Sequence, residues 1–330
     1  MLVGSRRRGG LELGNEGAIL SSLSLYRRGA GAFFFALLAT GASASGDPQP
    51  AEAALAVSAL VHHDASAPSG EARPIDLGGG LDLPKPASAQ KLEITYEVYV
   101  GGLHLATASM VATVDRGHYL AISTISTKGL ADSFASSQIA AVSTGDVRGR
   151  LIVPQTYNSD TKAPDKRQLV GLHYDHDGLP TDINANPPYD LTMFPVTTDQ
   201  RRGTVDPLSA ALYIMLGSSV SGDHKCGAVV PIFDGKRRYN LTFDYKKDDT
   251  ASLGKGYNNG KPVPAYLCTT NYVRVAGFKP SKTTYKVPEL EIWMAPYPGT
   301  DFILPVRMQT STEFGGIVAR ATKLVLTPSS

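Results

Sequence analysis

From residue 91 onward, apolar and polar side chains alternate with a period of two. Within residues 92–100, Leu92 and Ile94 lie on one side of this pattern and Glu93 and Thr95 on the other. Successive side chains of a β-strand point to opposite faces, so this alternation predicts a half-buried strand. The two glycines that follow predict a tight hairpin turn.

Nine further segments have the same strand character and are separated by turn-forming residues. They cover residues 103–114, 119–126, 147–155, 167–174, 237–245, 264–275, 289–294, 302–310 and 316–326. About ten strands and few helices predict an all-β, mainly antiparallel fold. We expect a curved open barrel or half-barrel.

Two of these segments allow more detailed predictions. In residues 237–245, the alternation predicts one shared face for Tyr239, Leu241, Phe243 and Tyr245. Pro305 lies inside another segment and has no backbone N–H to donate. That strand is therefore expected at a sheet edge or with a bulge.

One amphipathic helix interrupts the strands. Asp206 is a favourable N-cap, and Pro207 suits the first helical position. Apolar residues then recur at helical spacing: Leu208, Ala211, Leu212, Met215 and Leu216. We expect this stripe to pack on the concave face of the sheet, either as a permanent core helix or as the gate of a ligand groove. A second, shorter helix is expected over residues 130–134.

The N-terminal region has the composition of a targeting segment. Arg27 and Arg28 precede a short apolar run that contains three phenylalanines, and Ala42-Ser43-Ala44 follows as a cleavage site. A positive flank, a short apolar core and small residues are typical of a secretory signal peptide. We therefore expect a signal peptide over residues 1–44, a disordered Ala/Pro/Gly linker over 45–89, and a single β-rich domain over 90–330.

Composition and charge exclude several classes of protein. The formal net charge is +2 for the whole chain, and removal of the leader leaves −1. Such a balanced chain has no strong field to attract nucleic acid, and 42% hydrophobic residues are too many for general disorder. After signal cleavage, the protein is not expected to be an integral membrane protein. Cys226 and Cys268 form an even pair in an exported chain, which favours a disulfide over two separate buried thiols.

An ordered set of short motifs resembles an exported bacterial family called domain of unknown function 3108. The matching runs, over about residues 91–326, are 96–103, 129–132, 206–210, Cys226, 233–239, Cys268, Tyr272, 276–278 and Trp293. The resemblance implies a periplasmic, curved β fold similar in outline to lipoprotein-carrier half-barrels. It implies no established activity and therefore transfers no catalytic residues.

Few residues have a pattern that points to chemistry. His173, Asp175 and Asp177 would share one face of a strand, as metal ligands can, but Asp177-Gly178 is a turn signal, and solvation of a hairpin end is the simpler explanation. No cofactor, metal site or catalytic residue is therefore predicted. Arg237, Arg238 and Tyr239 follow an Asp-Gly turn and are binding candidates, since arginine on a concave face can hold a carboxylate or phosphate.

Two functional hypotheses follow. The first is a non-catalytic periplasmic protein that binds an apolar ligand, a wall component or a partner protein through its curved sheet, with Leu212 and Met215 of the helix in the concavity. The alternative is an envelope hydrolase or transferase that uses His173 and Asp175, or Arg238, with an unrecognised base. A polar cleft with clustered His and Asp would favour the enzyme.

Export makes a direct prediction. The mature protein is expected to begin at or near Ser45, because signal peptidase cleaves after the small residues at Ala42 and Ala44. Mass spectrometry of the envelope fraction measures the N-terminus. Protein that keeps Met1 and stays in the cytosol would contradict the prediction.

Overall fold

The computed structural model describes residues 90–129, 136–149, 151–216, 226, 229–253, 260–279, 289–298, 300, 302–312 and 315–328. The expected signal peptide, the linker and the short helix over residues 130–134 lie outside these described residues.

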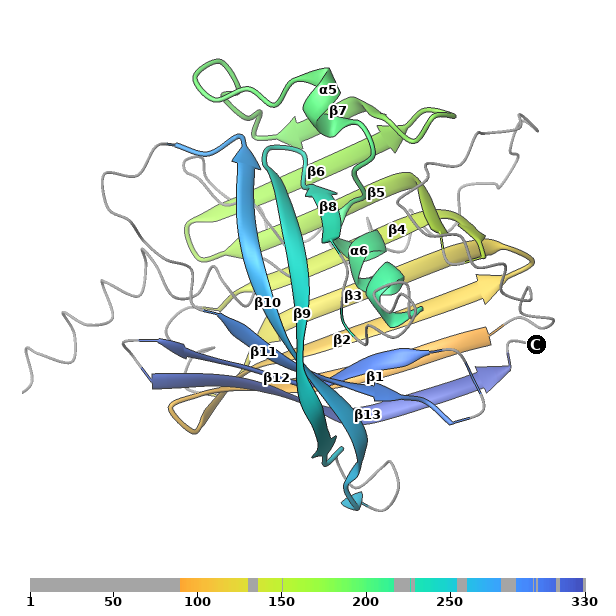
Figure 1. Cartoon of the computed structure of the whole chain (residues 1–330). Coiled ribbons are helices and arrows are strands. Elements are labelled where there is room, and N and C mark those ends of the chain that lie inside the picture. The colour runs from red at the N-terminus through yellow and green to blue at the C-terminus, as the bar shows by residue number, and fades with distance from the viewer. Residues whose placement is uncertain are drawn as a thin grey trace, which may run out of the picture.

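Thirteen strands form one antiparallel sheet, in the order β7-β6-β5-β4-β3-β2-β1-β13-β12-β11-β10-β9-β8 (Figure 1). Their bounds are β1 Gln90–Val100, β2 Leu103–Asp115, β3 His118–Thr127, β4 Gln138–Arg148, β5 Leu151–Ala163, β6 Lys166–Tyr174, β7 Pro180–Asn186, β8 Val229–Phe233, β9 Arg238–Ala251, β10 Val263–Ala276, β11 Leu290–Pro296, β12 Ile303–Thr312 and β13 Gly315–Pro328. Since β1 pairs with β13, the sheet edges are β7 and β8. The predicted all-β, open antiparallel architecture is confirmed, with thirteen strands instead of about ten.

Three predicted features of the strands differ in the structure. The expected strand over residues 147–155 is wrong, because β4 ends at Arg148 and β5 begins at Leu151. Gly149, with a φ of 62°, forms the turn between them. β4 was missed apart from its last two residues, and β7 and β8 are additional strands, both short and at the sheet edges.

The shared face of residues 239–245 is also only partly correct. Tyr239, Leu241 and Phe243 are buried, whereas Tyr245 is 42% exposed. The register with β10 shifts beside Cys268, where Lys246 is an extra residue on β9. Tyr245 is the last residue in register before this bulge, so it lies where the regular pairing of β9 with β10 is interrupted.

Pro305 follows the expected rule for proline in a sheet. β12 is an interior strand, but its register with β11 shifts beside Pro305, which identifies a bulge. The pairing of β12 with β13 begins only at Arg307, so the missing N–H interrupts no hydrogen bond there.

Helix α6, Pro207–Met215, lies on the inner face of the sheet over β3 and β4 (Figure 1). All nine of its residues are buried, and it contacts β3, β4, β5, β8 and β12. The predicted packing of the amphipathic helix on the concave face is therefore confirmed. The second helix described is the short α5, Thr198–Arg201, whose N-cap Thr197 forms a capping box with Gln200.

Asp206 attaches α6 to the sheet. Its Oδ1 accepts hydrogen bonds from the backbone N–H groups of Leu208 and Ser209, at 3.0 and 2.9 Å. Its Oδ2 accepts from the hydroxyls of Ser209 and Ser143 of β4. The Tyr119 hydroxyl lies 2.6 Å from Ser209 Oγ and extends the network to β3. One carboxylate thus caps the helix and fixes its position on two strands.

Burial determines the charge of this carboxyl group. Asp206 has no exposed surface, and burial raises its pKa from 3.8 to about 6. The hydrogen bonds from Ser209, Ser143 and the backbone oppose this shift because they favour the charged form.

Asp206→Asn is expected to remove a pH-dependent contribution to stability. Because the folded-state pKa is raised, the contribution of Asp206 is fully present below pH 3.8 and is lost as the pH rises through about 6. The free energy of unfolding of the wild type, relative to the variant, should fall by about 3 kcal/mol over that interval. Urea titrations at several pH values measure this difference, and parallel pH profiles for the two proteins would contradict it.

Leu212→Ala is expected to lower the free energy of unfolding by about 2–5 kcal/mol, because the Leu212 side chain is fully buried and its removal leaves a cavity. Leu103→Ala is the matched control, since Leu103 is 60% exposed. Equal losses in the two variants would show that Leu212 has no special role in packing.

Candidate functional site

The two cysteines join the chain beyond α6 to β10. Cys226 and Cys268 form a disulfide with a Cα–Cα distance of 6.0 Å, and both residues are 1% exposed. The predicted pairing is confirmed. A disulfide is typical of a protein that folds in an oxidising compartment.

Two of the candidate ligand-binding residues lie in the core. Leu212 has no exposed surface, and Met215 is 3% exposed. A ligand would reach these side chains only if α6 moved away from the sheet. Their role in ligand binding remains a prediction, whereas their packing role is evident from the structure.

The turn between β8 and β9 presents the basic candidates. Asp234 Oδ1 accepts hydrogen bonds from the backbone N–H groups of Lys236 and Arg237, at 2.8 and 2.6 Å. Gly235 has a φ of 92°, and a Cβ atom at this position would lie 2.6 Å from the Val170 side chain of β6. The turn therefore needs glycine both for its backbone conformation and for its contact with β6.

Arg238 and Tyr239 stabilise this region from within the fold. Arg238 donates hydrogen bonds to the Gln200 carbonyl at 3.0 Å and to the Asn240 side chain at 2.6 Å, so it links α5 to β9. Burial lowers its pKa. Tyr239 has no exposed surface and stacks on Tyr272 with ring centroids 4.5 Å apart. Of the basic candidates, Arg237 is the better placed for a ligand.

Arg237 belongs to a cluster of cations and aromatic rings that we call the basic rim. It consists of Tyr189, Lys236, Arg237, Tyr272, Arg274 and Phe278. The Lys236 ammonium lies 4.8 Å from the centroid of the Tyr189 ring. The guanidinium groups of Arg237 and Arg274 lie 5.9 and 5.2 Å from the centroid of the Phe278 ring. None of the three cations forms an ion pair with a described residue.

The buried Asp234 carboxylate sets the electrostatics below the rim. Burial raises the pKa of Tyr239 and Tyr272, and the nearby Asp234 raises both further. Arg237 lowers the same two pKa values, since a cation favours the ionised phenol. Asp234 is 2% exposed, so its carboxyl group is not part of the exposed surface of the rim. A carboxylate or phosphate is the group that such cations can bind.

Strand periodicity did not reveal all of the rim. Tyr189 belongs to the irregular segment after β7, and Arg274 lies at a register shift near the end of β10. Neither position has a periodic signal. The sequence contains one local signal, the dipeptide Gly277-Phe278. In the structure, a Cβ atom on Gly277 would overlap the Lys236 carbonyl oxygen. A glycine with a positive φ of 82° at that place indicates close packing against the β8–β9 turn.

The acidic hairpin considered as a metal site is a capped turn. Asp175 Oδ1 accepts hydrogen bonds from the backbone N–H groups of Asp177 and Leu179, and His173 is exposed on β6. No three His, Cys, Asp or Glu side chains within the described part of the chain are grouped so that they could hold a metal ion.

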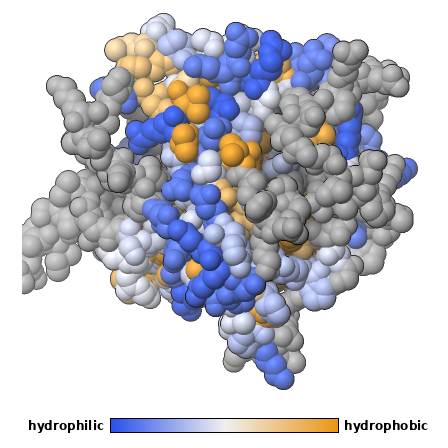
Figure 2. Space-filling model, viewed as in Figure 1, coloured by the Kyte–Doolittle hydropathy of each residue, from blue (hydrophilic) through white to orange (hydrophobic). Residues whose placement is uncertain are grey.

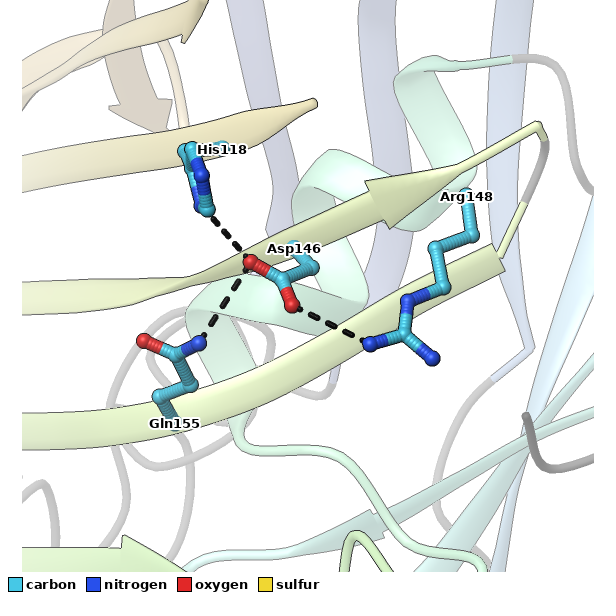
Figure 3. A network of polar contacts seen from close by, with 4 residues as sticks. All are labelled: His118, Asp146, Arg148 and Gln155. Atoms are coloured by element: carbon cyan, nitrogen blue, oxygen red, sulfur yellow. Dashed lines mark hydrogen bonds and ion pairs between the residues drawn. The ribbon is translucent and has the colours of Figure 1, made fainter. Parts of the chain in front are cut away.

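A separate polar network lies across β3, β4 and β5 (Figure 3). His118 Nδ1 is 2.8 Å from Asp146 Oδ1, Gln155 donates to the same oxygen, and Arg148 pairs with Oδ2. His118 and Asp146 are direct cross-strand neighbours. The four side chains include no hydroxyl or thiol group, and their contacts are a His–Asp contact between β3 and β4, a hydrogen bond from β5 and an ion pair within β4.

Among the described residues, no helix is both long and apolar enough to cross a membrane. The chain matches none of the curated proteins. A crystal structure of a β-barrel-like protein of domain of unknown function DUF1849 from Brucella abortus is similar over 73% of this chain and 99% of that chain, with 11% identity and a TM-score of 0.45. The family model for proteins of unknown function DUF3108 matches residues 95–322, so the chain belongs to that family, as the motifs predicted.

Proposed function

We propose that this protein is exported to the periplasm and acts there by binding an envelope ligand or partner at the basic rim, without catalysing a reaction. The observation that carries the proposal is the arrangement of Lys236, Arg237 and Arg274 over aromatic rings, with no ion pair to any acidic residue that the structure describes. A cation held over a ring keeps its N–H donors available for an acceptor outside the protein.

The interior supports a binding surface at the rim. α6 packs on the concave face against β3, β4, β5, β8 and β12, and the Asp206 network fixes it in place. Two of the polar residues considered for an enzyme have structural roles, because Asp175 caps a turn and Arg238 links two elements. Catalysis needs a nucleophile, a base and an orienting group at one place.

Photo-crosslinking in cells tests this proposal. Benzoylphenylalanine at Phe194, on the loop next to the rim, is expected to yield a covalent adduct with the bound ligand or partner. The same residue at Tyr245 is the matched control, since it replaces a partly exposed aromatic residue about 23 Å along β9 from Arg238. The adduct should disappear when Arg237→Glu and Arg274→Glu are combined with the Phe194 label.

Two outcomes would overturn the binding role of the rim. One is equal labelling from Phe194 and Tyr245. The other is an adduct that survives both charge reversals in a protein whose melting temperature is unchanged.

A further inference from the structure

An apolar loop extends beside the basic rim. Residues 187–197 connect β7 to α5 and contain Leu191, Met193 and Phe194. Met193 is 70% exposed, the largest value among the large apolar side chains that the structure describes. Leu191 and Phe194 are partly exposed. In Figure 2 this part of the surface, at the upper left, is hydrophobic and lies next to a strongly hydrophilic area.

The loop is supported on the rim at both of its ends. The Lys236 ammonium lies over the Tyr189 ring, and the Val196 side chain is so close to Gly277 that a Cβ atom there would lie 3.0 Å from it. Between these contacts, Asp190 Oδ1 accepts hydrogen bonds from the backbone N–H and the hydroxyl of Thr192, at 3.0 and 2.6 Å. These hydrogen bonds stabilise a turn, and Met193 projects from the chain directly after it.

Basic residues predominate around this loop. Residues 187–202, 234–238 and 272–278 carry Lys236, Arg201, Arg202, Arg237, Arg238 and Arg274, against Asp190, Asp199 and the buried Asp234. The mature chain as a whole is near neutral, so this excess is local. A projecting apolar side chain next to cations is the arrangement by which proteins bind an anionic membrane surface.

We propose that this end of the molecule binds the surface of an anionic lipid bilayer. Met193 and Phe194 enter the interfacial region, and Lys236, Arg237 and Arg274 contact the lipid phosphates. This inference rests on the proposed function, because it assigns a ligand class to the same rim. A bilayer fits the loop better than a protein partner does, since a stable protein interface needs a contiguous apolar core of many residues, whereas a bilayer accepts one projecting side chain.

Vesicle sedimentation with the purified exported protein tests this inference. The protein should sediment with phosphatidylglycerol vesicles and not with phosphatidylcholine vesicles, and added salt should release it. Lys236→Gln combined with Arg274→Gln should weaken binding by on the order of 25-fold, as about fivefold for each cation removed. Met193→Ser should also weaken binding. Leu103→Ser, at an exposed leucine of the β1–β2 hairpin, should leave it unchanged.

The circular dichroism spectrum and melting temperature of each variant confirm that it is folded. Failure to bind phosphatidylglycerol vesicles, or equal binding by folded wild-type and rim variants, would overturn the membrane inference. If adducts at Phe194 persist in cells in that case, the rim still binds a ligand of another class and the proposed function stands. Loss of both the adducts and vesicle binding would overturn both.

Discussion

The buried carboxyl group of Asp206 is the contact on which the arrangement of this protein depends. An open, curved sheet leaves one apolar face uncovered, and burial of that face is the main source of stability available to it. α6 supplies the cover, and Asp206 sets its position by capping the helix and bonding to β4 at the same time. A carboxylate with no exposed surface is costly to ionise, and four donors around it reduce that cost.

The chain that leads into α6, from α5 to Val205, also covers part of the open edges of the sheet. Val205 forms a parallel bridge to Ile232, which occupies part of the free edge of β8. On the other side, Arg201 donates a hydrogen bond to the Pro180 carbonyl of β7. Arg238 completes the connection by binding the Gln200 carbonyl. The two edges, which do not pair with each other, are thus joined through α5, and the basic rim forms where they approach.

How well the sequence predicted each element depended on how local its determinants are. The helix from Pro207 was predicted correctly, because its cap and apolar stripe lie within a dozen residues. Strand β4 was predicted poorly, since its small residues, such as Ala140, Ala141 and Gly145, give a weak alternation. The bulge at Lys246 had no signal in the sequence, because a register shift depends on the partner strand as well.

Prediction of the basic rim from the sequence has the same limit. Arg237 could be proposed from its place after an Asp-Gly turn, but its relation to Arg274 depends on the pairing of β9 with β10. Tyr189 reaches Lys236 from a loop 47 positions away in the chain, a contact set by the packing of that loop on the β8–β9 turn. Such contacts between irregular segments follow no period, so sequence patterns alone do not reveal them.

The packing of α6 on the concave face affects where a ligand can bind. Carrier proteins of barrel shape keep an empty interior for their ligands, which sacrifices packing energy in that space. Here the interior is occupied by residues such as Leu208 and Leu212 with no exposed surface. Lys236, Arg237 and Arg274, which form no ion pair with a described residue, and Met193, the most exposed of the large apolar side chains described, lie near one another where the chain crosses between the sheet edges. A surface site of this kind can bind a ligand without displacing the helix, so binding and stability are not in conflict.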